Sequence, residues 1–175
     1  MHAMVVVESL FGNTRTIADA VAEGLSDAMD VEVIDVGAAP TVIEGGLDLL
    51  VVGGPTHAFG MTRPETRRSA AEQAGHDTVP QVGLREWLAA LAPASTAIPA
   101  ATFDTRVKAP VPGSAGRAAA RRLGKLGFRV VAPVQRFVVA GTPGPLLDGE
   151  QARARRWGER LAATIVKDAE RPDRR

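Results

Sequence analysis

The order of apolar and polar residues along the chain predicts five strands separated by helices. Residues 5–7 are all valine, and residues 47–52 are apolar except for Asp48. Continuous apolar runs of this kind indicate strands that helices cover on both faces. Residues 31–36 mix apolar and acidic side chains, which predicts a half-exposed strand. The other two strands are predicted over residues 97–105 and 128–140, the last broken or bulged at Pro133.

Apolar residues at helical spacing lie between the predicted strands. One stripe comprises Ile17, Ala18, Val21 and Leu25, and another comprises Leu84, Trp87, Leu88 and Leu91. Trp87 is therefore predicted to pack in the core rather than against a cofactor. Further helices are predicted over residues 63–73, over residues 114–126 with Ser114 as the cap, and along a last stripe that contains Trp157.

Strands that alternate with helices predict an α/β fold, with one doubly wound five-stranded parallel sheet and right-handed crossovers. In such folds ligands bind beyond the carboxyl ends of the strands, where the strand order reverses. The loops after the first, third and fourth strands are expected to meet there. We assign residues 1–168 to this single domain and residues 169–175 to a charged tail that frays.

Composition narrows the classes of function. The chain of 175 residues has no cysteine, which excludes disulfides, thiolate metal sites, iron–sulfur clusters and a cysteine nucleophile. Its three scattered histidines argue against a zinc site, and we predict no metal. A formal charge of +1 gives no global signal for nucleic acid or a membrane. No stretch approaches the ~20 apolar residues of a membrane span, and no signal peptide is visible, so we expect a cytoplasmic protein.

The loop after the first strand carries the first candidate chemistry. It comprises Ser9, Leu10, Phe11, Gly12, Asn13 and Thr14. Backbone N–H groups and the positive end of the helix dipole converge there and favour an anion, with hydroxyl donors from Ser9 and Thr14. Without a lysine, the loop can hold a phosphate but is not built to cleave one. Ordinary helix capping by Asn13 or Thr14 is the alternative interpretation.

A second loop, over residues 53–61, is rich in glycine and contains Pro55 and Phe59. Together the two loops resemble the flavodoxin family: the first resembles its phosphate loop, and residues 53–60 resemble its first flavin-ring loop. The family usually has a threonine where Phe11 stands, and an aromatic there resembles flavodoxin-like domains of larger flavoprotein oxidoreductases. The resemblance extends over most of the chain, through residues 142–150 and the last helix.

The resemblance implies FMN as the cofactor and the strand order 2-1-3-4-5, in which the loops after strands one and three touch the switch point. The phosphate would lie on the first loop, and the ring would lie between the loops after strands three and four. The implied ring-side residues are Pro55, Thr56, His57, Ala58, Phe59, Gly60, Asp104, Thr105 and Arg106. Other ligands of this architecture fit worse, because the chain has no Gly-x-Gly-x-x-Gly, no Walker lysine and no phosphate-accepting aspartate at residues 53–55.

The residues around the flavin ring depart from the family, which usually stacks tryptophan and tyrosine on the ring. The chain has no tyrosine, and both tryptophans lie on helix stripes. Phe59 is the best candidate to cover one face of the ring, while Phe103 can equally point into the core. His57 can donate to the ring or be solvated. Arg106 can lie beside the ring or pair with Asp104 at the surface.

Two classes of function therefore remain open. In the first, the protein binds FMN and acts in electron transfer or as a small flavin-dependent oxidoreductase, with no catalytic residue of its own. In the second, a flavodoxin-like domain has lost FMN and serves as an interaction module. Arg117, Arg121, Arg122 and Lys125 suggest an acidic redox partner or a merely solvated face. This helix lacks interleaved aromatics, which argues against nucleic acid.

Overall fold

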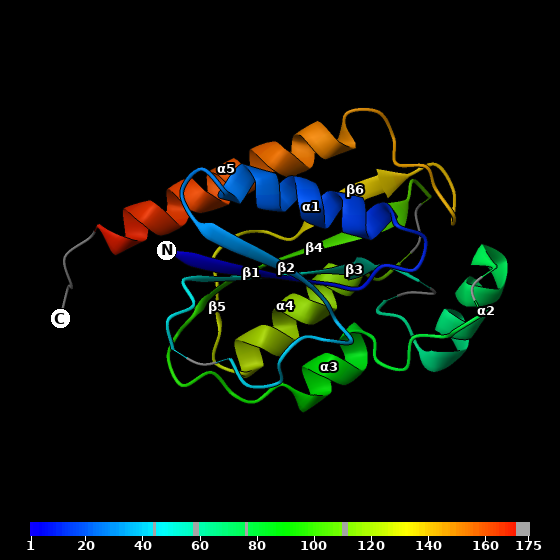
Figure 1. Ribbon diagram of the computed structural model, residues 1–175, viewed down its shortest axis with the longest axis horizontal. Helices are drawn as coiled ribbons and strands as arrows, with labels where there is room; N and C mark the ends of the chain where they lie inside the picture. Colours follow the sequence, from blue (N-terminus) through cyan, green and yellow to red (C-terminus); the bar gives the residue numbers. More distant parts are fainter. Residues whose placement is uncertain (44, 58–59, 76, 110–111, 171–175) are drawn as a thin grey trace.

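A parallel sheet forms the centre of the computed structural model, which describes residues 1–43, 45–57, 60–75, 77–109 and 112–170 (Figure 1). The strands are β1 (His2–Val7), β2 (Asp30–Asp35), β3 (Leu49–Pro55), β4 (Pro99–Val107), β5 (Arg129–Val130) and β6 (Gln135–Val139). The helices are α1 (Asn13–Leu25), α2 (Pro64–Ala74), α3 (Leu84–Ala90), α4 (Ala115–Lys125) and α5 (Glu150–Ala169).

The strand order is β2-β1-β3-β4-β5, and β6 also pairs with β4. β5 pairs with Pro99 and Ala100, whereas β6 pairs with the segment of β4 from Phe103 to Val107. The two short strands thus follow one another along a single edge of β4. The predicted order 2-1-3-4-5 is confirmed, and the predicted break in the last strand is the interval around Pro133, which cannot donate to the ladder.

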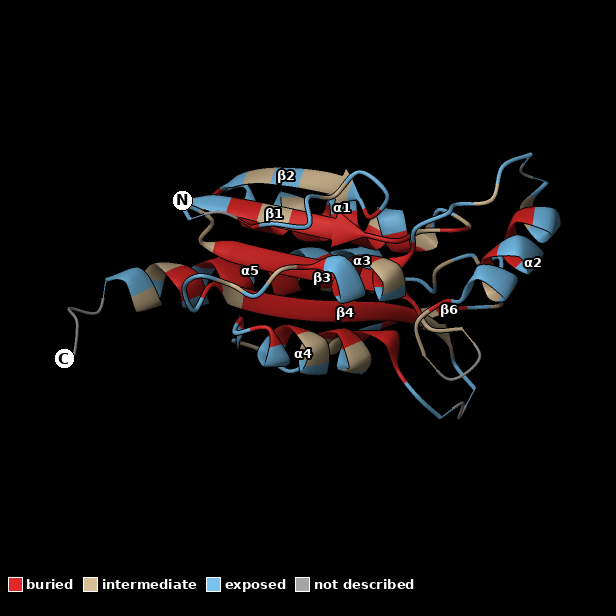
Figure 2. Ribbon diagram, turned by 90° about the horizontal axis from the view of Figure 1, so that it is seen from below, coloured by how far each residue is buried: buried red, intermediate tan, exposed pale blue. Residues whose placement is uncertain are grey.

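Two helices cover each face of the sheet (Figure 1). α1 and α5 bury one side of β1, β3 and β4, where Phe103, Phe137 and Trp157 pack with ring centroids 5.9–6.3 Å apart. α3 and α4 bury the other side around Trp87 and Leu123. Figure 2 shows β3 buried along its length and β4 buried over most of it, while β2 at the edge is partly exposed. Covering on both faces explains the continuous apolar runs of the inner strands.

The sheet positions two further features. α2 projects past the carboxyl ends of the strands, away from both helical layers (Figure 1). α5 continues to Ala169, one residue past the predicted domain boundary, and residues 171–175 lie outside the described residues. None of the helices in the described ranges is both long and apolar enough to cross a membrane.

Candidate functional site

A pocket of about 170 Å³ lies at the carboxyl ends of the strands, where the sequence predicts a site. Segments after β1, β3 and β6 and the end of β4 converge on it, although they lie far apart in the chain. Its lining residues are Leu10, Phe11, Asn13, Thr14, Pro55, Thr56, His57, Thr105, Arg106, Val107, Val139 and Thr142. Nine of these are predicted site residues, and Val107, Val139 and Thr142 are additions that the sequence did not indicate.

The loop after β1 is shaped by Gly12, which precedes α1 with φ +85°, a value that favours glycine. The Ser9 hydroxyl accepts a hydrogen bond from the Arg15 N–H at 3.1 Å. Asn13 donates from its side chain to the Pro143 carbonyl at 3.1 Å. The expectation that Asn13 or Thr14 caps the helix is therefore wrong, because Ser9 reaches across the loop to do so.

Capping by Ser9 still leaves donors at the start of α1. The first N–H groups of a helix have no intrahelical acceptor. Within the described part of the chain, the backbone N–H groups of Asn13 and Thr14 make no hydrogen bond. A Cβ added to Gly12 would meet open space rather than protein atoms. The loop thus presents uncommitted donors at the positive end of a helix dipole, as an anion requires.

Thr14 and Thr105 meet at the floor of the pocket. Their hydroxyl oxygens are 2.7 Å apart, and both residues are buried. One hydroxyl donates to the other, so the pair as a whole has a single O–H proton left for a ligand. Thr14 thus lines the pocket, but its hydroxyl is shared with a neighbour on β4.

Asp104 faces the side of the sheet opposite to its neighbour Thr105, because adjacent strand residues point to opposite faces. It is 0% exposed, does not line the pocket, and its Oδ2 accepts from Thr56 Oγ1, Ser114 Oγ and the Gly116 N–H. The Thr56 hydroxyl also accepts from the Ala115 N–H at 2.9 Å. Asp104 and the Thr56 hydroxyl therefore fasten β3 and β4 to the start of α4.

Two further expectations about β4 are corrected. The strand runs to Val107, two residues past its predicted end, so Arg106 lies within it and not in the loop that follows. Arg106 donates from Nη1 to the Gly113 carbonyl at 3.1 Å, and no ion pair joins it to Asp104 within the described residues. Arg106 does line the pocket, as predicted.

The glycines after the third predicted strand have a structural role. Gly53 and Gly54 lie within β3 and are buried. A Cβ on Gly53 would stand 2.0 Å from the Phe103 ring, and one on Gly54 would stand 2.4 Å from the Leu84 side chain. These glycines therefore make room for core packing, and the loop proper begins at Thr56.

His57 and Gly60 exchange two backbone hydrogen bonds of 2.9 and 3.0 Å. The predicted site residues between them, Ala58 and Phe59, lie outside the described residues. His57 lines the pocket and a smaller cavity of about 110 Å³ shared with α2 and Thr142. Its side chain is half-buried, and this desolvation lowers the pKa of the imidazole below 6.5. A neutral ring at neutral pH can accept as well as donate a hydrogen bond.

Phe11 is the aromatic residue that the described structure places beside the pocket. It lines the pocket on one side and a more open groove of about 600 Å³ on the other. Gly12 and Ser9 lie in that groove with Arg15 and Ala74. Phe103 is fully buried in the aromatic core cluster, so its possible contact with a ring is excluded.

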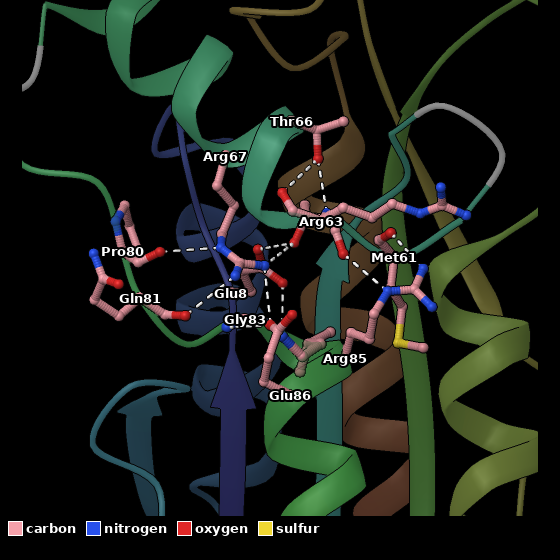
Figure 3. A network of polar contacts seen from close by, with 12 residues as sticks. Glu8, Met61, Arg63, Thr66, Arg67, Pro80, Gln81, Gly83, Arg85 and Glu86 are labelled. Atoms are coloured by element: carbon pink, nitrogen blue, oxygen red, sulfur yellow. Dashed lines mark hydrogen bonds and ion pairs between the residues drawn. The ribbon is translucent and has the colours of Figure 1, made fainter.

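A buried polar network supports the two loops from the α3 side of the sheet (Figure 3). Glu8, next to Ser9, accepts from Thr62 Oγ1 and from the Leu84 N–H at 2.8 Å. Arg67 of α2 is only 1% exposed and donates to Thr62 Oγ1, to Pro80 O and to Gln81 O. Its Nη1 also lies 3.0 Å from Glu86 Oε2 of α3. The network joins the end of β1 to α2, α3 and the segment between them.

Burial changes the protonation equilibrium of Glu8 in this network. Desolvation raises the pKa of the Glu8 carboxyl, while the hydrogen bonds from Leu84 and Thr62 and the charge of Arg67 oppose that rise. Periodicity could not indicate this cluster, because Arg67 lies near the exposed Arg63 and Arg68 on a polar helix. Only the fold shows that this arginine turns inward.

The architecture was compared with known proteins. No family model and no curated protein matches the sequence. A flavodoxin from the domain Archaea superposes with a TM-score of 0.65 at 20% identity, covering 95% of this chain and 99% of that chain. The fold is that of the flavodoxins. Oxidised flavodoxin 1 from Bacillus cereus gives a TM-score of 0.63 at 18% identity over 95% of this chain and 98% of its own.

Larger flavoproteins contain the same flavodoxin-like fold. The flavodiiron core of Flv1 from Synechocystis superposes with a TM-score of 0.62 at 20% identity, covering 95% of this chain but 36% of that chain. The similarity confirms the predicted flavodoxin-like α/β fold over nearly the full chain. At these identities the likeness concerns the fold, so a ligand has to be argued from the site itself.

Proposed function

We propose that this chain binds FMN in the pocket between the loops after β1 and β3, and acts in electron transfer or as a small flavin-dependent oxidoreductase. The observation that carries the proposal is the pair of uncommitted N–H groups of Asn13 and Thr14 at the start of α1. Asn13 and Thr14 line the pocket, and a Cβ built on the preceding Gly12 would meet no atom within 4 Å. A phosphate monoester is the anion that matches such a helix terminus.

The size and lining of the pocket suit one end of FMN. Its volume of about 170 Å³ is below the roughly 300–1,000 Å³ of a typical ligand pocket. The phosphate and the adjoining polyol chain would occupy this space, with Thr14 and Thr105 as hydroxyl partners. The ring would extend past it, where Phe11, His57 and Arg106 border the opening. These residues would bind and orient the cofactor, and bound FMN supplies the redox chemistry.

A simple binding measurement tests the proposal. Protein is mixed with excess FMN, passed through gel filtration and scanned in the visible range. We expect the flavin bands to travel with the protein, and FMN fluorescence to change on binding. Protein that emerges colourless at micromolar concentration would contradict the proposal.

The second candidate function is a flavodoxin-like interaction module without flavin. One observation favours it: both tryptophans and Phe103 are buried in the core, so Phe11 is the phenylalanine or tryptophan that lines the pocket within the described residues. A ring held by few aromatic contacts binds more weakly, because each aromatic pair contributes about 0.5–1.5 kcal/mol beyond burial. Colourless protein that still folds would favour this alternative.

A further inference from the structure

Charge is distributed unequally between the two edges of the sheet. Residues 9–43, which form α1 and β2, contain six acidic residues and one arginine, and all six acidic side chains are exposed. Residues 87–147 contain eight lysines and arginines and a single acidic residue, the fully buried Asp104. Because β2 and β5 lie at opposite edges of the sheet, the molecule has a strong charge asymmetry although its formal charge is only +1.

The basic side is most regular on α4. Arg117, Arg121 and Lys125 are exposed and lie four residues apart, so they form one stripe along the helix. Arg122 instead turns toward α3, where it donates to the Leu88 carbonyl at 3.1 Å. Across the described residues, no carboxylate forms an ion pair with the three residues of the stripe. Their charges are left for an external partner.

One end of this stripe lies at the candidate site. The first residues of α4 are fastened to the loop after β3, since Ala115 N–H donates to Thr56 Oγ1 and Ser114 donates to Asp104. Thr56 also lines the pocket. Arg117 is therefore the residue of the stripe nearest the site, and Arg121 and Lys125 continue away from it along α4.

We propose that the α4 stripe docks a protein partner with an acidic surface, and so holds it beside the pocket. The inference rests on the proposed function in one respect: the docked partner would face the flavin. Charge asymmetry orients a compact acidic partner toward one face and speeds its association. A nucleic acid fits less well, because α4 offers no aromatic platform on which bases could stack.

Two variants with the same charge change test the proposal. R117E/R121E/K125E reverses the stripe on α4. R156E/R160E/K167E reverses two arginines and one lysine that are exposed on α5, on the opposite face of the sheet. Binding of poly-L-glutamate is measured by amide chemical shifts at low and physiological salt, with single-stranded DNA of equal charge as the competing polyanion.

We expect poly-L-glutamate to shift α4 amides in the parent, and the α4 reversal to weaken binding by about tenfold while the α5 reversal changes it less than about twofold. Higher salt should weaken binding in the parent. Equal losses in both variants, or tighter binding of DNA through α4, would overturn the proposal. FMN titrations of the same proteins separate the two hypotheses. A parent protein that does not bind FMN refutes the proposed function. If the parent binds FMN but the α4 reversal leaves poly-L-glutamate binding unchanged, only the docking surface is refuted.

Discussion

The hydroxyls of Thr14 and Thr105 show how a single contact changes what a residue can do for a ligand. From the sequence, Thr14 is an independent donor to a phosphate, but the structure places its oxygen 2.7 Å from that of Thr105. Two hydroxyls that bond to one another retain one proton between them. The phosphate would therefore receive one hydroxyl hydrogen bond from the pair, and either residue could supply it.

Replacing either threonine by valine should consequently weaken FMN binding little, because the remaining hydroxyl can turn its proton to the phosphate. The double variant Thr14→Val/Thr105→Val should lose a hydrogen bond to a charged group, about 1.5–3 kcal/mol or roughly 10–150-fold in affinity. Fluorescence titration measures the FMN affinity of the three variants, and Thr164→Val, at an exposed position of α5, is the control. A double variant no weaker than either single one would exclude this contact.

His57 provides a second test at the scale of one residue. Burial lowers the pKa of its imidazole below 6.5, so the unfolded chain binds a proton more readily than the folded protein. Its contribution to stability is therefore present above pH 6.5 and is lost as the pH falls through that value toward the lowered pKa.

We expect proton NMR to give a pKa for His57 below 6.5 without ligand, and a still lower pKa once FMN is added, because a flavin ring beside the imidazole removes more water from it. The ring signals of His2, at the opposite end of β1, should not respond to FMN. A pKa for His57 that is unaffected by bound FMN would place the flavin ring away from this loop.

At the scale of elements, α2 depends on one inward-facing side chain. Arg67 contacts Thr62, Glu86 and the carbonyls of residues 80 and 81, and Thr62 in turn donates to Glu8 beside the loop after β1. Periodicity predicted a helix over residues 63–73, close to the observed Pro64–Ala74. It could not predict the network, because the partners of Arg67 come from the segment before α2, from the segment between α2 and α3, and from α3.

Arg67→Met should cost about 3 kcal/mol of unfolding free energy, at the low end of the effect for breaking a buried ion pair, since Glu86 is partly exposed. The adjacent Arg68→Met is the matched control, because Arg68 is exposed and should change stability by less than about 0.5 kcal/mol. Urea unfolding compares the two. Equal losses of unfolding free energy in the two variants would show that Arg67 contributes no more to stability than an exposed arginine.

For the whole molecule, hydrophobic patterning predicted the covered parallel sheet, and the resemblance to flavodoxins implied its strand order. The apolar runs of β1 and β3 and the stripes of α3 and α5 predicted the covered parallel sheet, and Pro133 predicted the interruption between β5 and β6. The approximate place of the site followed from topology. The roles of individual side chains could not be predicted in the same way. Asp104 and Thr105 are adjacent on β4 and so face opposite sides of the sheet, and Val139 and Thr142 line the pocket only because β6 pairs with β4.

If the start of α1 binds the phosphate of FMN, as we propose, then riboflavin must bind more weakly than FMN. Riboflavin keeps the ring and the polyol chain but lacks the phosphate. Two charged hydrogen bonds at about 1.5–3 kcal/mol each predict that riboflavin binds at least about 100-fold more weakly than FMN in equilibrium fluorescence titrations. Equal affinity for the two flavins would contradict the claim, because a flavin held without its phosphate would not use the N–H groups of Asn13 and Thr14.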